Sequence, residues 1–314
     1  MCLVGARTYR RQMIEARGLT KHYGRTRAVE NVTFTVHPGR VTAFLGPNGS
    51  GKSTTMRLIL GLDTPTSGQV WVVGRPYRAL VRPLHTVGAL LDAGDVMGSR
   101  SAAAHLAFLA AANGIRRGRV DEVLGSVGLA EVAGHRVKGF SLGMRQRLGI
   151  AAALLGDPAV LVLDEPVNGL DTDGIRWIRQ LLRTMADEGR TVLLSSHLMS
   201  ETELVADHLL VIGDGELLAD EPVRQFVERH AEPVVRVRSA DMSRLAELLG
   251  PRMRVHGDTG TVRGSTAREI GRVAAAHGIA LDELVQVHAS VEEVFTRLVS
   301  GHDPHRHRDL REPM

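Results

Sequence analysis

Residues 46–53 (GPNGSGKS) constrain this chain more than any other segment. They follow a short apolar run at residues 41–45 (VTAFL) and precede apolar residues at helical spacing, which predicts a buried strand, a tight turn and a helix. Glycines let the turn curl so that successive N–H groups point inward at a phosphate, and the helix adds its positive N-terminal end. The alternative is a glycine-rich turn without a ligand. The phosphate-binding interpretation gives the expected nucleotide contacts Gly46, Pro47, Asn48, Gly49, Ser50, Gly51, Lys52, Ser53 and Thr54.

Within this loop, Lys52 supplies a charge for the β- and γ-phosphates and Ser53 a hydroxyl for Mg²⁺. A pair of acids, Asp164 and Glu165, ends another apolar run at residues 160–163 (VLVL). The carboxyl end of a buried parallel strand is where ligands bind in open α/β sheets, so Asp164 is placed to hold Mg²⁺. Glu165 is placed to orient and deprotonate an attacking water. Two acids after a strand can also cap a helix, but the phosphate loop upstream favours the magnesium interpretation.

Two further residues are candidates for the functional site. His197 follows the apolar run at residues 191–194 (TVLL) and is expected at the same edge of the sheet. There it can bond a γ-phosphate or position water, with a structural histidine as the alternative. Ser141 is predicted to cap a helix that continues to about residue 155. Because a helix start can bind an anion, this segment is either an ordinary capped helix or a site for the nucleotide of another subunit.

The order of apolar runs predicts two domains. Strands alternate with helices over about residues 14–219, which favours an α/β domain with a mainly parallel sheet. Antiparallel strands at residues 32–36 and 69–73 and helices at 101–113 and 120–127 accompany it. After Pro222 the order is strand-helix-strand-strand-helix-strand, with a turn at residues 258–260, which predicts a small α+β domain of the split βαβ, ferredoxin-like kind. The expected divisions are an N-terminal extension (1–12), a nucleotide-binding domain (13–220), a C-terminal domain (221–300) and a flexible tail (301–314).

Composition excludes several classes of protein. The 314 residues are 43% hydrophobic and 24% charged, which excludes intrinsic disorder for most of the chain. The single cysteine, Cys2, excludes an intrachain disulfide. No apolar stretch reaches the roughly 20 residues that a membrane-spanning helix needs. The net charge of +4 is spread along the chain and does not indicate nucleic-acid binding.

The order of phosphate loop, SLGMRQR segment, acidic pair, Asp171 and His197 resembles the ATP-binding subunits of ABC transporters. The form SLGMRQR resembles a subgroup of bacterial exporters that includes antibiotic-efflux systems. The resemblance implies a P-loop NTPase fold in which two copies of the chain sandwich two ATP molecules with Mg²⁺. It also implies an ATPase that powers export through a separate integral membrane permease, without a nucleic-acid partner. The chain would then lie in the cytoplasm, held at the inner face of the membrane by that permease.

The same resemblance implies roles for individual residues. Tyr23 would stack on adenine, and Asp171 would communicate across the dimer. Asp92 stands where the family usually has glutamine, at a position that senses Mg²⁺ and water and faces the permease. The signature expected to contact the ATP of the partner subunit comprises Ser141, Leu142, Gly143 and Met144. Leu142 and Met144 depart from the usual glycine and glutamine of that signature.

Two other functions remain open at this point. A soluble ATPase of the same family that acts on nucleic acid or the ribosome uses the same motifs. The segment between Lys52 and Ser141, however, contains no heptad run that would form the long coiled coil of chromosome-associated members. A small-molecule kinase would use the phosphate loop alone and would leave Ser141 and His197 unexplained.

Overall fold

The computed structural model describes residues 13–94, 96–197, 199–230, 234–287 and 290–301. The expected N-terminal extension, which includes Cys2, and the tail beyond residue 301 lie outside the described residues. The described chain divides into two compact units, the first ending at Val223 and the second spanning Arg224–Gly301.

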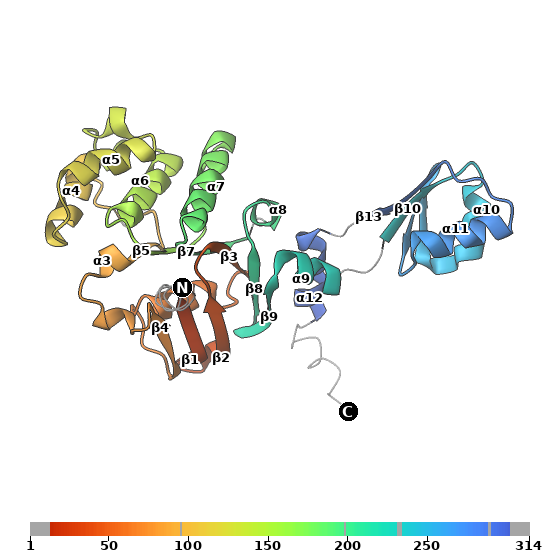
Figure 1. The fold of residues 1–314 in the computed structure, drawn as a ribbon, viewed down its shortest axis with the longest axis horizontal. Coiled ribbons are helices and arrows are strands. Elements are labelled where there is room, and N and C mark those ends of the chain that lie inside the picture. Colours follow the sequence, from red (N-terminus) through yellow and green to blue (C-terminus); the bar gives the residue numbers. More distant parts are fainter. Residues whose placement is uncertain (1–12, 95, 198, 231–233, 288–289, 302–314) are drawn as a thin grey trace, which may run out of the picture. The chain divides into compact units, whose positions relative to one another are not determined.

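A six-stranded sheet forms the centre of the first unit (Figure 1). Its strands are β3 (Arg40–Leu45), β5 (Val87–Leu90), β6 (Val160–Leu163), β7 (Thr191–Ser196), β8 (His208–Gly213) and β9 (Glu216–Pro222). Their order is β5-β6-β7-β3-β8-β9, and every neighbouring pair is parallel except β8 and β9. All residues of β6 and β7 are buried, as expected for parallel strands covered on both faces. The predicted mainly parallel sheet is confirmed, and β9 is an antiparallel edge strand that the sequence analysis did not identify.

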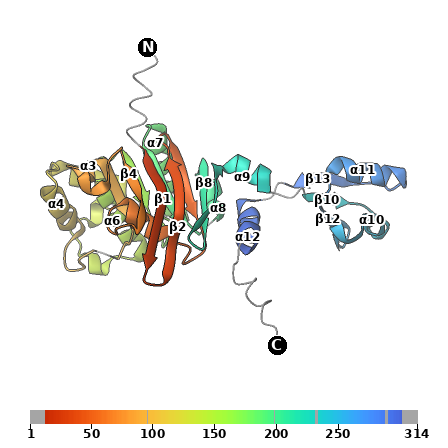
Figure 2. The ribbon, with the colours of Figure 1, turned by 90° about the horizontal axis from the view of Figure 1, so that it is seen from below.

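A second, antiparallel sheet of the first unit packs against the parallel one. It has the strands β1 (Ile14–Tyr23), β2 (Thr26–Val36) and β4 (Ser67–Val72) in the order β2-β1-β4 (Figure 2). Its buried side chains share one core with those of β3 and of α2 (Lys52–Ile59). Phe34 and Phe44 meet in that core with ring centroids 6.0 Å apart. The strand expected at residues 32–36 is the second half of β2, which begins at Thr26.

Helices and 3₁₀ turns lie in the connections from β4 through to β8 (Figure 1). They are α3 (Pro83–Thr86), α4 (Ala102–Ala112), α5 (Gly118–Ser126), α6 (Leu142–Leu154), α7 (Thr172–Asp187) and α8 (Met199–Glu203), with the 3₁₀ turns η1 (Tyr77–Ala79), η2 (Ala130–Val132) and η3 (Val137–Gly139). Ser101 caps α4 by accepting a hydrogen bond of 3.2 Å from the Ala104 N–H. The helices predicted at residues 101–113 and 120–127 correspond to α4 and α5.

The second unit has the predicted split βαβ arrangement. Its elements are α9 (Val223–His230), β10 (Val234–Arg238), α10 (Met242–Leu249), η4 (Gly250–Arg252), β11 (Met253–His256), β12 (Thr259–Arg263), α11 (Ala267–Ala276), β13 (Glu283–Val287) and α12 (Val291–Gly301). The sheet order is β11-β12-β10-β13, with all pairs antiparallel. Its core includes Val235, Leu245 and Ile270.

One detail of this unit corrects the sequence analysis. Thr259 and Gly260 were expected in a turn, but both lie in β12, and the turn is at Gly257 and Asp258. A side chain at Gly260 would lie 2.4 Å from the Met253 methyl and 2.6 Å from that of Met242. This glycine therefore makes room for core side chains inside a strand.

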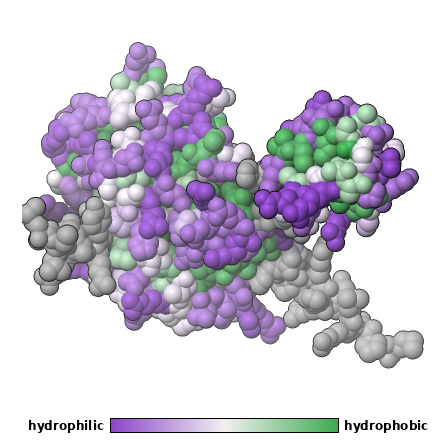
Figure 3. All heavy atoms as spheres, turned by 45° about the vertical axis from the view of Figure 1, so that its right-hand side comes forward, coloured by the Kyte–Doolittle hydropathy of each residue, from purple (hydrophilic) through white to green (hydrophobic). Residues whose placement is uncertain are grey.

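The surface in Figure 3 is largely hydrophilic, with smaller hydrophobic areas. None of the helices in the described parts of the chain combines the length and the apolar character needed to cross a bilayer.

Candidate functional site

The expected phosphate loop lies between the end of β3 and the first turn of α2. Gly49 and Gly51 have φ values of 83° and 105°, in the left-handed region that side chains disfavour. A Cβ atom at Gly51 would also lie 2.3 Å from the Ala28 carbonyl oxygen. Both the backbone conformation and the available space therefore require glycine at position 51.

Lys52 is folded back over this loop. Its Nζ atom donates hydrogen bonds to the carbonyl oxygens of Gly46 at 2.6 Å and Pro47 at 3.0 Å. The residue is only 7% exposed, and this burial lowers the pKa of Lys52, whereas the Glu165 and Asp164 carboxylates act in the opposite direction. The Ser50 hydroxyl oxygen is buried and has no hydrogen-bond partner within the described residues. The loop thus holds a buried cation beside a curled backbone, which is a site suited to an anion.

The two acids emerge directly after β6, as predicted. The Asp164 N–H donates to the Leu90 carbonyl at 2.7 Å, and the Ser195 hydroxyl donates to Asp164 Oδ1. Glu165 has a left-handed backbone, with φ of 49°, and its N–H donates to Ser195 Oγ at 2.9 Å. Its Oε2 atom lies 2.7 Å from Nδ1 of His197. The structure therefore brings both acids and His197 together at the carboxyl edge of the parallel sheet.

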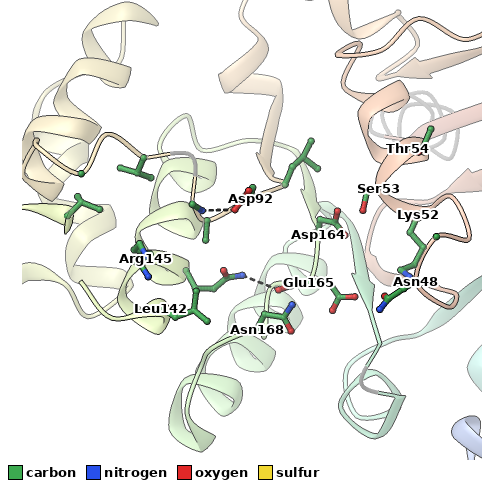
Figure 4. A pocket seen from close by; sticks show the side chains of 18 of the residues that line it. Asn48, Lys52, Ser53, Thr54, Asp92, Leu142, Arg145, Asp164, Glu165 and Asn168 are labelled. Carbon is green, nitrogen blue, oxygen red and sulfur yellow. Dashed lines mark hydrogen bonds between the residues drawn. The ribbon is translucent and has the colours of Figure 1, made fainter. Parts of the chain in front are cut away.

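A pocket of about 690 Å³ joins the loop and the acids to α6 (Figure 4). In that view Ser53 lies near Asp164, whereas Leu142 and Arg145 lie on the opposite side. The pocket is lined by Asn48, Gly49, Gly51, Lys52, Ser53, Thr54, Leu91, Asp92, Ala93, Gly94, Val96, Gly98, Val137, Lys138, Leu142, Arg145, Gln146, Asp164, Glu165 and Asn168.

The three residues expected to hold a metal, Ser53, Asp92 and Asp164, all line this pocket. Asp92 Oδ1 accepts a hydrogen bond of 2.6 Å from the Gly94 N–H. In the described part of the chain, no three His, Cys, Asp or Glu side chains gather into a metal-binding group. An all-oxygen set with few protein ligands fits Mg²⁺, which usually takes one or two carboxylates and fills its shell with water and phosphate oxygens.

The signature residues start α6 beside the loop that precedes α7. Ser141 Oγ accepts a hydrogen bond of 3.2 Å from the Met144 N–H, which makes Ser141 the predicted N-cap. Leu142 is 53% exposed, and its side chain covers Gly169, where a Cβ atom would lie 2.4 Å from Leu142 Cγ. Asp171 caps α7 through a hydrogen bond of 2.8 Å from the Gly174 N–H. Of the four signature residues, Leu142 alone lines the pocket.

Tyr23 lies at the end of β1 and does not line the pocket. Its hydroxyl donates to Asp63 Oδ2 at 2.7 Å, and this bond raises the pKa of Tyr23. Asp63 also accepts a hydrogen bond of 2.8 Å from Arg57, which is the main reason that its pKa falls to about 2. The Lys21 ammonium lies 4.8 Å from the centre of the Tyr23 ring, so a cation contacts the surface expected to receive adenine.

Several residues of this site were missed by the sequence analysis. Gln146 is buried and donates through Nε2 to the Glu165 carbonyl at 3.1 Å. Ser195 contacts both acids because Leu163 pairs with Leu194, which brings Ser195 level with Asp164. Recognising Ser195 requires knowing that β6 and β7 are neighbours. Lys138 of η3 and Arg145 of α6 also line the pocket, and only the fold reveals this.

A glycine-rich loop before a helix, with acids at the end of a parallel strand, defines a P-loop nucleotide-binding domain. A family model described as ABC transporter matches residues 29–168. A second model, described as a domain of unknown function (DUF8746), matches residues 233–292. The chain belongs to the ABC transporter family, as an ATP-binding subunit.

Two curated relatives support this assignment. The bacitracin transport ATP-binding protein BcrA of Bacillus licheniformis is 34% identical over 301 residues, which cover 92% of this chain and 98% of BcrA. The lantibiotic transport ATP-binding protein SrtF of Streptococcus pyogenes is 36% identical over 208 residues, 66% of this chain and 90% of SrtF. The predicted resemblance to the transport ATPases of antibiotic-related systems is thereby confirmed.

The fold also matches a solved structure. A dimeric structure of a post-hydrolysis state of the ATP-binding cassette MJ0796, bound to ADP and Pi, has a TM-score of 0.61 and 26% identity to this chain. The match covers 67% of this chain and 98% of MJ0796. The predicted P-loop fold is confirmed.

Proposed function

We propose that this chain hydrolyses ATP to ADP and phosphate and thereby powers export through a separate membrane permease. The observation that carries the proposal is the meeting of Lys52, Asp164 and Glu165 in one pocket, with His197 bonded to Glu165. A phosphate-binding cation, a ligand for a divalent metal and a candidate base are the groups that hydrolysis of a terminal phosphate requires.

The nucleotide would be held by residues 46–54, with Tyr23 beside the base. Ser53, Asp92 and Asp164 are the proposed ligands of Mg²⁺, which when bound neutralises charge that develops on the phosphates. Glu165 would orient and deprotonate the attacking water, and His197 would hold Glu165 and contact the γ-phosphate. The 2.7 Å contact between the two side chains supports this division of roles.

A second copy of the chain would complete the site. The N-terminus of α6, capped by Ser141, would contact the ATP held by the loop of the partner copy together with Leu142, Gly143 and Met144. Asp171 would link the two sites. Two observations support this arrangement: Ser141 lies outside the pocket of its own chain, and the similar cassette MJ0796 is a dimer.

The proposed assembly lies on the cytoplasmic face of the membrane. Transport needs a path across the bilayer, and we propose that a separate permease subunit provides it. The names of BcrA and SrtF suggest an antibiotic as the exported substrate. We assign the nucleotide site to a domain over residues 13–220 and a supporting or regulatory role to the domain over residues 221–300.

The test is ATP hydrolysis by the purified chain with Mg²⁺, together with purification of the chain with the membrane protein encoded beside its gene. We expect hydrolysis that Lys52→Ala abolishes and co-purification with that membrane protein. The proposal is wrong if the wild-type chain neither hydrolyses ATP nor associates with a membrane protein. Tight, salt-sensitive binding to RNA or DNA would instead indicate the nucleic-acid function.

A further inference from the structure

We propose that Ser195 is a positioning residue that fixes both acids of the nucleotide site through one hydroxyl group. This inference rests on the proposed function, because it concerns how Asp164 and Glu165 are presented to a bound metal and nucleotide.

The hydroxyl has two partners from the neighbouring strand. Ser195 Oγ donates its proton to Asp164 Oδ1 and accepts the Glu165 N–H at 2.9 Å. A serine hydroxyl has one proton and two lone pairs, so these two bonds use its only proton and one acceptor position. The residue has no exposed surface, and water therefore does not compete for the Ser195 hydroxyl.

The bond to Asp164 determines which carboxylate oxygen remains for other ligands. With Oδ1 bound to Ser195, rotation of the carboxylate would break a partly buried hydrogen bond to a charged group. Oδ2 then remains in a fixed orientation on a residue that lines the pocket. Such a partner behind a metal ligand typically controls metal affinity by orienting that ligand.

The bond to Glu165 stabilises an unfavourable backbone conformation. Glu165 has φ of 49°, which is uncommon for a residue with a side chain and is retained where surrounding contacts enforce it. Its N–H is held by Ser195, and its carbonyl oxygen accepts hydrogen bonds of 3.1 Å from Gln146 Nε2 and from the Asn168 N–H. These three bonds fix the direction in which the Glu165 side chain leaves the backbone, toward His197.

The test compares Ser195→Ala with Ser195→Thr, which retains the hydroxyl. Binding of Mn²⁺ is measured by electron paramagnetic resonance in the presence of a non-hydrolysable ATP analogue, so the readout is independent of turnover. We expect Ser195→Ala to weaken Mn²⁺ binding by about tenfold and to raise the Mg²⁺ concentration for half-maximal ATPase activity similarly. Ser195→Thr should recover most of the Mn²⁺ affinity. If Ser195→Ala fails to fold, Ser195→Cys, a weaker donor of similar size, replaces it.

A matched control is the buried hydroxyl of Thr42, which lies in β3 of the same sheet. It has no hydrogen-bond partner within the described residues, so Thr42→Val should leave Mn²⁺ binding unchanged. A folded Ser195→Ala variant with wild-type Mn²⁺ affinity and Mg²⁺ dependence would overturn the inference and leave the proposed function intact. A wild-type chain that binds no Mn²⁺ with the nucleotide would overturn both.

Discussion

Nδ1 of His197 lies 2.7 Å from Oε2 of Glu165, although 32 positions separate the two residues in the sequence. Glu165 follows β6 and His197 follows β7, and these parallel strands are neighbours in the sheet. The contact therefore results from strand order, and it connects the candidate base to a group that can hold it in one rotamer. Both side chains lie at the edge of the sheet where the phosphate loop opens.

Glu165→Gln should trap an ATP-bound dimer and stop turnover. Glutamine keeps the shape of the side chain but cannot accept a proton from water, so we expect the ATPase rate to fall by at least about a hundredfold. Size-exclusion chromatography with ATP and Mg²⁺ measures the dimer. A variant that stays monomeric and hydrolyses ATP at the wild-type rate would contradict the mechanism.

Asp92→Gln should retain ATPase activity. Asp92 lines the pocket and accepts the Gly94 N–H at 2.6 Å, and a glutamine retains an oxygen ligand on a longer side chain. The comparison is the steady-state rate of each protein at saturating Mg²⁺ and ATP. A loss of more than about tenfold, equivalent to ~1.4 kcal/mol, would count against the assigned position of Asp92.

Leu142 and Gly169 should be energetically coupled. Gly169→Ala places a methyl group 2.4 Å from Leu142 Cγ in a left-handed backbone with φ of 74°, so both a clash and backbone strain lower stability. In a Leu142→Ala background the contacts with Cγ and Cδ2 are removed, which leaves the Cβ atom of residue 142 at 3.1 Å and a backbone strain of about 1 kcal/mol. Urea unfolding of the four proteins of this double-mutant cycle gives the coupling. If Gly169→Ala lowers the free energy of unfolding equally in both backgrounds, Leu142 does not limit the space at this glycine.

Asp63 should make stability depend on acid pH. Its pKa falls from 3.8 to about 2 in the folded chain, so its stabilising contribution is complete above the unfolded value and is lost as pH falls through the folded value. Asp63→Asn should therefore unfold at a lower urea concentration than the wild type near neutral pH. The two midpoints should converge between about pH 4 and pH 2. If the difference between the two urea midpoints stays constant over this pH range, the carboxylate is not the stabilising group.

The parts of the site that depend on local sequence could be predicted. The loop, the acidic pair and the cap at Ser141 each depend on a few consecutive residues whose backbone preferences are strong. The parts that depend on strand order could not. Ser195 and Gln146 reach the acids from elements far along the chain, and a serine in a strand or a glutamine in a helix carries no local signal of that role.

In the second unit, Gly260 led to a wrong prediction of secondary structure, because it lies in β12 and not in a turn. Gly260 has the same local sequence context as a turn glycine, but it is needed because two methionine side chains fill the space above β12. Packing of this kind depends on residues of α10 and β11, which the local sequence around position 260 does not contain.

The cap at the start of α6 has a genetic consequence. Ser141 accepts the Met144 N–H, and within the described residues its own proton is not committed to another group. In the proposed pair, that proton serves the nucleotide of the other copy. Co-expression of a Lys52→Ala copy with a Ser141→Ala copy would then place both lesions at one catalytic centre and leave the other whole. The two alleles should therefore complement each other when they are co-expressed, although each defective allele alone is inactive.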